Sequence, residues 1–142
     1  KSKLDTGALT SSLHARNIER FEKDGEEWVR FEVNVEDQDE DEKVSRKFER
    51  PLYRDVIIGG AGGEERRPVV LMEICFGDTV HEEQFSLENR SDMIYPVLIG
   101  RRTIQHLGVV DVTNTFMHEP QCDEDSPVEK FDKDNTDEDV GV

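Results

Sequence analysis

The sequence has no long hydrophobic run and few cysteines. No segment approaches the roughly 18 consecutive apolar residues of a membrane-spanning helix, and the start shows no signal-peptide pattern. Two cysteines are too few for a disulfide framework, and we expect Cys75 to be a buried thiol and Cys122 to lie in an acidic segment. These features predict a reducing compartment and a cytoplasmic location. Because Lys1 is not an initiator methionine, we expect a natural N-terminal segment, with any targeting signal, to be absent from this sequence.

Basic residues are also scarce. Lys and Arg number 18 against 34 Asp and Glu, so the net charge is -16, and no basic stripe is available to bind nucleic acid. Residues 36–42 carry -6 and residues 119–142 carry -8, which leaves the rest nearly neutral. Such segments lack apolar residues for a core. We predict one domain over 1–118 with an acidic loop insertion at about 36–47, a disordered acidic tail, and neither nucleic-acid nor membrane partners. An electrostatic arm that masks a basic site is the alternative for these segments.

One short motif indicates a possible chemistry. Asp5-Thr6-Gly7-Ala8 places a carboxylate beside a hydroxyl and a glycine, as aspartic peptidases do with their catalytic aspartate. Hydrolysis by such an aspartate needs a second carboxylate that shares its proton, because like charges about 3 Å apart cannot both ionise. The motif occurs once, so this chemistry predicts a homodimer. The alternative is an ordinary turn in which Asp5 accepts backbone hydrogen bonds and Gly7 supplies a positive φ.

Two further segments accompany this motif. Residues 57–63, Ile-Ile-Gly-Gly-Ala-Gly-Gly, lead into a glycine-rich tip, and residues 96–101, Pro-Val-Leu-Ile-Gly-Arg, form an apolar run closed by glycine and arginine. In this order, the three segments resemble the catalytic loop, flap hairpin and pre-helical segment of the retropepsins, the single-domain aspartic peptidases of retroviral type. The resemblance implies a mainly β, closed acid-protease barrel with one short helix near the C-terminal end. It also implies a flap that closes over a peptide.

A narrower resemblance is to the bacterial and archaeal RimB-type group, named as ATP-dependent zinc proteases and linked to ribosomal-protein modification. Residues 3–15, 65–70 and 89–93 carry this resemblance. It implies a glutamate-rich protein tail as substrate. Arginines suit such a substrate because the guanidinium fork matches a carboxylate. Pairing of these arginines with the chain's own Asp and Glu residues is the alternative.

The motifs, the two resemblances and the arginine chemistry together predict three groups of site residues. The catalytic group is Asp5, Thr6 and Gly7. The substrate-binding group is Ala8, Ile58, Gly59, Gly60, Ala61, Gly62, Arg66, Arg67 and Arg101, with Arg90 and Arg102 as further candidates for an arginine patch. The group that supports the Asp5 loop from below is Val97, Leu98, Ile99 and Gly100.

These residues predict an aspartic endopeptidase that acts as a homodimer on a peptide or protein substrate. One Asp5 would take a proton from water while its protonated twin donates toward the carbonyl oxygen. Leu9 stands where retroviral enzymes have an acidic partner for the arginine of the Gly-Arg pair. A noncatalytic retropepsin-like module for dimerisation or peptide binding is therefore the alternative. We expect no cofactor and no metal, because His81-Glu82-Glu83-Gln84 begins like a zinc motif but is followed by Phe85.

The apolar pattern predicts mostly strands. Val29 and Phe31 alternate with charged residues, and the segment 23–26 before them has the composition of a hairpin turn. A glycine, Gly108, follows a short helical pattern. The expected elements are strands over residues 15–21, 28–35, 69–76, 80–87 and 109–112, and a helix over residues 101–107.

Overall fold

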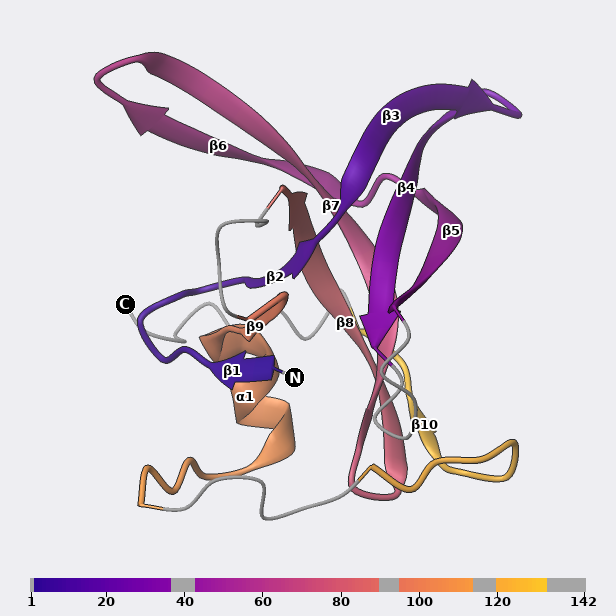
Figure 1. Ribbon diagram of the computed structural model, residues 1–142, viewed down its shortest axis with the longest axis vertical. Helices are drawn as coiled ribbons and strands as arrows, with labels where there is room; N and C mark the ends of the chain where they lie inside the picture. The colour runs from indigo at the N-terminus through magenta and orange to yellow at the C-terminus, as the bar shows by residue number, and fades with distance from the viewer. Residues whose placement is uncertain (1, 37–42, 90–94, 114–119, 133–142) are drawn as a thin grey trace.

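The protein consists mainly of β-strands with one short helix (Figure 1). The computed structural model describes residues 2–36, 43–89, 95–113 and 120–132. Its elements are β1 (Ser2–Leu4), β2 (Ser11–His14), β3 (Arg16–Lys23), β4 (Glu26–Glu36), β5 (Lys43–Pro51), β6 (Arg54–Gly60), β7 (Gly63–Phe76), β8 (Thr79–Glu88), β9 (Val97–Ile99), α1 (Arg101–Leu107) and β10 (Val128–Glu129). The prediction of a mainly β protein with one short helix is confirmed. Within the described segments, no helix is long and apolar enough to cross a membrane.

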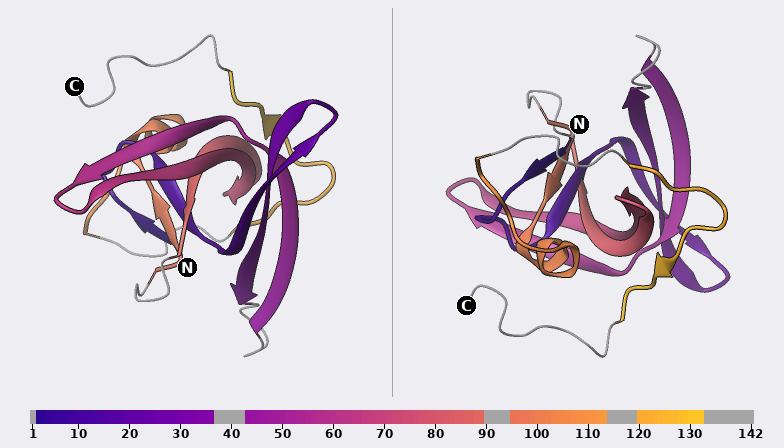
Figure 2. Two further views of the ribbon diagram at one scale, coloured as in Figure 1. Left: turned by 90° about the horizontal axis from the view of Figure 1, so that it is seen from above. Right: turned by 90° about the horizontal axis from the view of Figure 1, so that it is seen from below.

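The strands form two sheets that do not close into the predicted barrel. The larger sheet has the order β1-β9-β2-β8-β7-β6, with β10 paired to β8, and the smaller sheet has the order β3-β4-β5. A closed barrel requires the outer strands of a sheet to pair, but β1 and β6 stay at opposite edges of the larger sheet. Figure 2 shows the smaller sheet against one end of the larger one, while the β6–β7 hairpin extends away from it.

The predicted hairpin of β3 and β4 is confirmed. Val29 and Phe31 are fully buried, and Arg30 between them forms an ion pair of 3.0 Å with Glu49 on β5. This alternation is what a half-buried strand requires, because successive side chains point to opposite faces. The turn contains Asp24 and Gly25 with φ values of 52° and 81°, which match the positive φ values of a tight hairpin turn.

The strands predicted over residues 69–76 and 80–87 are also confirmed, as β7 and β8, which pair in a hairpin, but two other segments differ from expectation. Strand β5 was not predicted, because charged residues dominate its sequence; it pairs with β4, and Phe48 stacks on Phe31 with ring centroids 5.6 Å apart. The strand predicted over residues 109–112 is wrong. Val109 and Val112 are 101% and 88% exposed, so these valines are not buried as the side chains of a core strand would be.

The core lies where the two sheets meet. Each large apolar side chain that is fully buried contributes about 1.5–3 kcal/mol relative to exposure. The buried core residues are Leu13, Ala15, Val29, Phe31, Val70, Phe85, Leu87 and Ile99. Ile99 belongs to β9, so this core reaches the base of the predicted Asp5 site.

The two cysteines form a disulfide, which corrects the prediction of free thiols. Cys75 on β7 bonds to Cys122. The two cysteines are 47 residues apart in the sequence, and no local pattern indicates that they pair. The bond fixes residues 120–132 of the predicted tail beside the β7–β8 hairpin, and β10 within this segment pairs in parallel with β8.

Candidate functional site: the Asp5 loop

The Asp5 loop connects β1 to β2 at one edge of the larger sheet (Figure 1). Strand β9 lies between these strands, parallel to β1 and antiparallel to β2. The Asp5 amide donates to the Ile99 carbonyl at 2.8 Å. Val97, Leu98 and Ile99 thus lie between the two strands that the loop connects, and Ile99 contacts the Asp5 backbone directly.

Within the loop, the Asp5 carboxylate faces its own backbone. The Gly7 amide donates to Asp5 Oδ1 at 2.9 Å, and the Ala8 amide donates to the Asp5 carbonyl at 3.2 Å. A Cβ atom on residue 7 would lie 3.2 Å from Asp5 Oδ1, so glycine leaves room for this close contact. Such bonds occur both in an ordinary Asp turn and in a loop that holds a carboxylate for catalysis.

Helix α1 holds the other side of the loop. The Arg101 and Arg102 amides donate to the Ala8 and Leu9 carbonyls at 2.8 and 3.1 Å. Arg101 Nη1 also donates to the Thr6 carbonyl at 2.9 Å. Arg101 therefore contacts loop backbone, although Leu9 replaces the acidic partner that retroviral enzymes supply.

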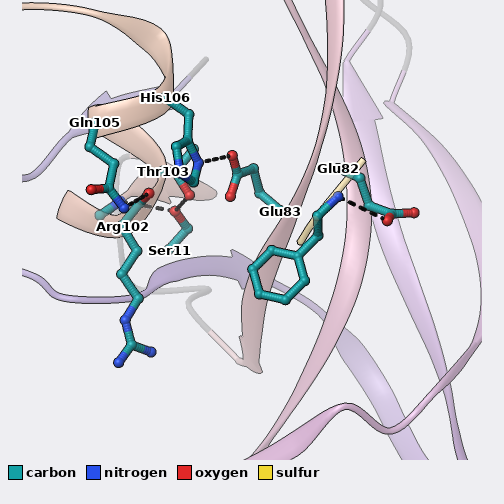
Figure 3. A network of polar contacts seen from close by, with 9 residues as sticks. Ser11, Glu82, Glu83, Arg102, Thr103, Gln105 and His106 are labelled. Carbon is teal, nitrogen blue, oxygen red and sulfur yellow. Dashed lines mark hydrogen bonds and ion pairs between the residues drawn. The ribbon is translucent and has the colours of Figure 1, made fainter. Parts of the chain in front are cut away.

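Beneath the loop, β2 and α1 meet through a buried polar contact. The Gly100 amide donates to Ser11 Oγ at 2.9 Å, and Ser11 Oγ shares a hydrogen bond of 2.8 Å with Thr103 Oγ1 (Figure 3). A Cβ atom on residue 100 would lie 2.7 Å from the Thr10 carbonyl carbon. Only glycine permits this approach, so Gly100 brings the helix against the loop.

The predicted flap is the hairpin of β6 and β7. Gly60 pairs with Gly63, whose φ of 111° suits glycine, and Ala61 and Gly62 form the tip. Ile58 and Gly59 pair with Glu65 and Glu64. The hairpin extends on the side of the molecule that carries the Asp5 loop (Figures 1 and 2).

Two arginines of the predicted patch have carboxylate partners within the chain. Arg67 Nη1 lies 2.6 Å from Glu88 Oε2, and Arg66 lies 3.5 Å from Asp55. Asp55 also accepts a hydrogen bond of 2.6 Å from Arg20, which holds the pKa of its carboxyl below the ordinary value. Arg66 and Arg67 thus pair with the chain's own carboxylates, as the alternative interpretation of these arginines predicted. Arg90 lies outside the described residues.

Arg102 of the predicted patch and Arg54, which was not predicted, lie close to the Asp5 loop. Arg54, at the start of β6, donates from Nε to Gln84 Oε1 at 2.7 Å and from Nη2 to Thr10 Oγ1 at 3.1 Å. Burial lowers the pKa of Arg54, and the positive charge of Arg102 lowers it further. Among residues 2–36, 43–89, 95–113 and 120–132, neither Arg54 nor Arg102 forms an ion pair with a carboxylate.

At the opposite end of α1, His106 Nδ1 lies 2.7 Å from Glu83 Oε1 (Figure 3). The Glu83 side chain is 6% exposed, and this burial raises the pKa of its carboxyl, although the hydrogen bond with His106 acts in the opposite direction. The contact anchors the last turn of the helix to β8. In the part of the chain that the structure describes, no three His, Cys, Asp or Glu residues are grouped as metal ligands.

Sequence reasoning missed three residues of this region. Ser11 lies within residues 3–15, and Thr103 lies in the predicted helix over residues 101–107, but no contact between them was predicted. Arg54 precedes the apolar start of the predicted flap, and nothing local distinguishes it from a surface arginine. The contacts of these residues come from elements distant in sequence, so no local pattern could reveal them.

Curated relatives resemble most of this chain. A protein of Shewanella pealeana is 34% identical over 116 residues, covering 82% of this chain and 25% of the relative. A protein of Desulfotalea psychrophila is 35% identical over 112 residues, covering 78% of this chain and 24% of the relative. Both are named "Probable alpha-L-glutamate ligase". The chain thus spans about a quarter of the length of these relatives.

These names contradict the predicted function. A ligase forms a bond, whereas the predicted homodimeric aspartic endopeptidase would break one. The relatives also carry a ligase name in place of the zinc-protease name that the narrower resemblance implied. The prediction failed because the Asp5 motif indicates how a carboxylate is presented and does not determine the reaction of the whole protein.

A solved structure and a family model identify the family. The crystal structure of a Legionella pneumophila protein of unknown function is similar with a TM-score of 0.67 and 38% identity, over 82% of each chain. The family model RimB-like, described as "Retropepsin-like aspartic endopeptidase RimB", matches residues 1–121. The descriptions of this family and of the curated relatives are both those of enzymes. The retropepsin-like resemblance is therefore confirmed, and the chain belongs to the RimB-like family.

Proposed function

We propose that the chain is an acidic-peptide-binding domain that serves alpha-L-glutamate ligation, and that it holds a glutamate-rich polypeptide beside the Asp5 loop. The names of the curated relatives support the link to glutamate. Because the chain corresponds to about a quarter of those proteins, the proposal gives it peptide recognition and leaves bond formation to the remainder.

The observation that carries this proposal is the pair Arg54 and Arg102. The whole chain has a net charge of -16, so most arginines have acidic residues available as partners. Two guanidinium groups that repel each other and have no carboxylate partner in the described residues favour an external anion. A glutamate carboxylate matches the guanidinium fork and would relieve this repulsion.

The surrounding strands supply a second means of holding a peptide. Strand β6 is the outer strand of the larger sheet, so its free edge can pair with an extended peptide. Ile57 and Ile58 on this strand are 58% and 37% exposed. Arg54 begins the same strand, so a peptide along β6 would pass the arginine pair. The predicted contacts of Ile58 to Gly62 with substrate belong to this proposal.

Fluorescence anisotropy with a labelled oligoglutamate peptide tests the proposal. Loss of a charge-assisted hydrogen bond costs about 1.5–3 kcal/mol, so Arg102→Gln should weaken binding at least about tenfold. Arg54→Gln should also weaken binding, whereas Arg46→Gln, an exposed arginine on β5, should change affinity less than about twofold. A neutral oligoglutamine peptide of the same length should not bind. Equal binding by wild type and Arg102→Gln would overturn the proposal.

The same peptide distinguishes binding from the enzyme type in the family description. Mass spectrometry after incubation would reveal any cleavage of oligoglutamate. We expect the peptide to stay intact with wild type and with Asp5→Asn. Cleavage by wild type that is absent in Asp5→Asn would assign an aspartic peptidase and would contradict a role in binding alone.

Pairing of two chains is a separate part of the proposal. Leu4 and Leu9 lie on either side of the Asp5 loop and are 44% and 39% exposed, and β1 is an outer strand. Two copies that meet here would bury these leucines and bring both loops together. Sedimentation velocity over a range of protein concentrations measures this association directly, and a monomer throughout would contradict it.

A further inference from the structure

Residues 120–132, here called the strap, cross the β7–β8 hairpin and then follow β8 (Figures 1 and 2). The Gln121 amide donates to the Gly77 carbonyl at 2.7 Å, and the Val80 amide donates to the Pro127 carbonyl at 2.9 Å. Strand β10 pairs with only two residues of β8. The backbone therefore attaches the strap at few points.

The side chains at the far end of the strap add weak contacts. Lys130 lies 3.5 Å from Glu73 and 3.7 Å from Glu82, and the lysine side chain is 67% exposed. The Phe131 amide donates to Glu82 Oε1 at 3.2 Å, and its ring meets Tyr53 edge-on at 5.3 Å. Exposed ion pairs contribute little, since water and salt screen them.

The covalent bond is the strongest attachment of the strap. Cys122 near its start bonds to Cys75 on β7, across 47 residues of sequence. Bringing two residues so far apart in sequence together without a covalent bond costs considerable chain entropy. The disulfide removes most of this cost, so it stabilises the attached strap more than any single noncovalent contact does. Both cysteines are only partly buried, so a small reductant can reach them.

The strap also forms one wall of a cavity of about 360 Å³. The other walls come from β8 and α1, including the buried Glu83 and its partner His106 (Figure 3). Phe131 lines the cavity from the strap side. Departure of the strap would open this cavity and expose the Glu83–His106 pair, which anchors the helix behind the Asp5 loop.

We propose that the Cys75–Cys122 disulfide is a redox-controlled latch, whose reduction releases the strap from β8 and opens the cavity beside α1. A dithiol supplies two electrons and two protons, the sulfur–sulfur bond breaks, and Cys75 and Cys122 become thiols while the dithiol becomes a disulfide. This inference does not depend on the proposed function, because it concerns the strap and not the arginine pair.

Hydrogen exchange followed by mass spectrometry tests the latch in the full chain. Addition of dithiothreitol should speed exchange at least about tenfold in peptides that contain Gln121, Val80 and Phe131, because their hydrogen bonds hold the strap. Peptides that cover β4 and β5 should not change, which shows that the fold survives. The Cys75→Ser/Cys122→Ser variant should exchange rapidly with or without dithiothreitol.

Two results would overturn the latch. The first is a rise in the exchange rate of less than about tenfold when dithiothreitol is added to wild type, measured in the strap peptides. It would mean that noncovalent contacts suffice to hold the strap. The second is a mass that shows two free thiols after treatment with oxidised glutathione, because the disulfide would then not form in solution.

Discussion

The Asp5 loop and the strap are held in opposite ways. The loop is fixed by backbone hydrogen bonds to β9 and α1 and by a close contact at Gly100. The strap is fixed by one disulfide, a few backbone hydrogen bonds, two residues of strand pairing and partly exposed side chains. Strong attachment through the backbone suits a region that must keep its geometry, whereas attachment that depends mainly on one covalent bond allows release under a change of conditions.

The two regions share one component. Glu83 lines the cavity behind the strap, and through His106 it contacts the helix that supports the loop. A change in the strap could therefore reach the Asp5 loop through a short path of identified contacts: Glu83 to His106, and Thr103 to Ser11. Release of the strap would therefore act on the helix that supports the Asp5 loop.

The largest expected effect concerns the loop. In Gly100→Ala, the new Cβ would lie within 2.7–2.9 Å of Thr10 and Ser11 backbone atoms, which cannot move aside as a flexible side chain could. Overpacking of this kind should lower the free energy of unfolding by about 2–3 kcal/mol. Urea denaturation monitored by circular dichroism measures the change.

Gly59→Ala provides the matched control for this substitution. Residue 59 also lies beside the predicted substrate-binding face, but a Cβ atom there would meet no atom within 4 Å. Its free energy of unfolding should stay within about 1 kcal/mol of wild type. Similar values for the two variants would show that close packing at Gly100 does not hold the loop.

An intermediate effect should appear at Glu83, where the two regions meet. Burial raises the pKa of this carboxyl above its ordinary value of 4.5, so the folded protein binds the proton more tightly than the unfolded chain. The resulting stabilisation is present below pH 4.5 and is lost as the pH rises through the folded pKa. Glu83→Gln removes this dependence because the amide does not titrate.

Urea denaturation at several pH values measures the Glu83 effect. The free energy of unfolding of wild type, minus that of Glu83→Gln, should fall as the pH rises from below 4.5. Because His106 contacts the Glu83 carboxyl directly, Glu83→Gln should also be compared in the His106→Asn background. A difference that increases with pH in both backgrounds would show that burial does not dominate at Glu83.

The contrast between the regions also explains what the sequence could predict. The order of Asp5, the glycine-tipped hairpin and Gly100 is local information, and it was sufficient to identify the retropepsin-like family. Arg54 and the Cys75–Cys122 bond depend on contacts between distant segments, which alternation and turn composition do not encode. Residues 109–112 show the converse error, because their apolar pattern fits a strand but Val109 and Val112 are exposed.

The aspartic-peptidase motif at Asp5 was also insufficient to predict the reaction. Asp5-Thr6-Gly7-Ala8 predicted a carboxylate held by a tight loop, and the structure shows the Gly7 amide bonded to that carboxylate. The reaction depends on what else surrounds the loop in the complete protein, and the matched residues make up only about a quarter of each relative. A local motif can therefore predict the shape of a site while the predicted reaction is wrong.

The smallest effect should come from the strap. In Lys130→Ala, the ion pairs with Glu73 and Glu82 are lost, but the lysine is 67% exposed, so the free energy of unfolding should fall by only about 0.2–1 kcal/mol. With the disulfide intact, strap exchange should hardly change. In the Cys75→Ser/Cys122→Ser background, where the strap is already released, the same substitution should leave the rapid exchange at Phe131 unchanged. Hydrogen exchange of both variants compares these cases.

A large effect of Lys130→Ala with the disulfide intact would mean that charge, and not the covalent bond, holds the strap. The contrast with the Asp5 loop would then disappear.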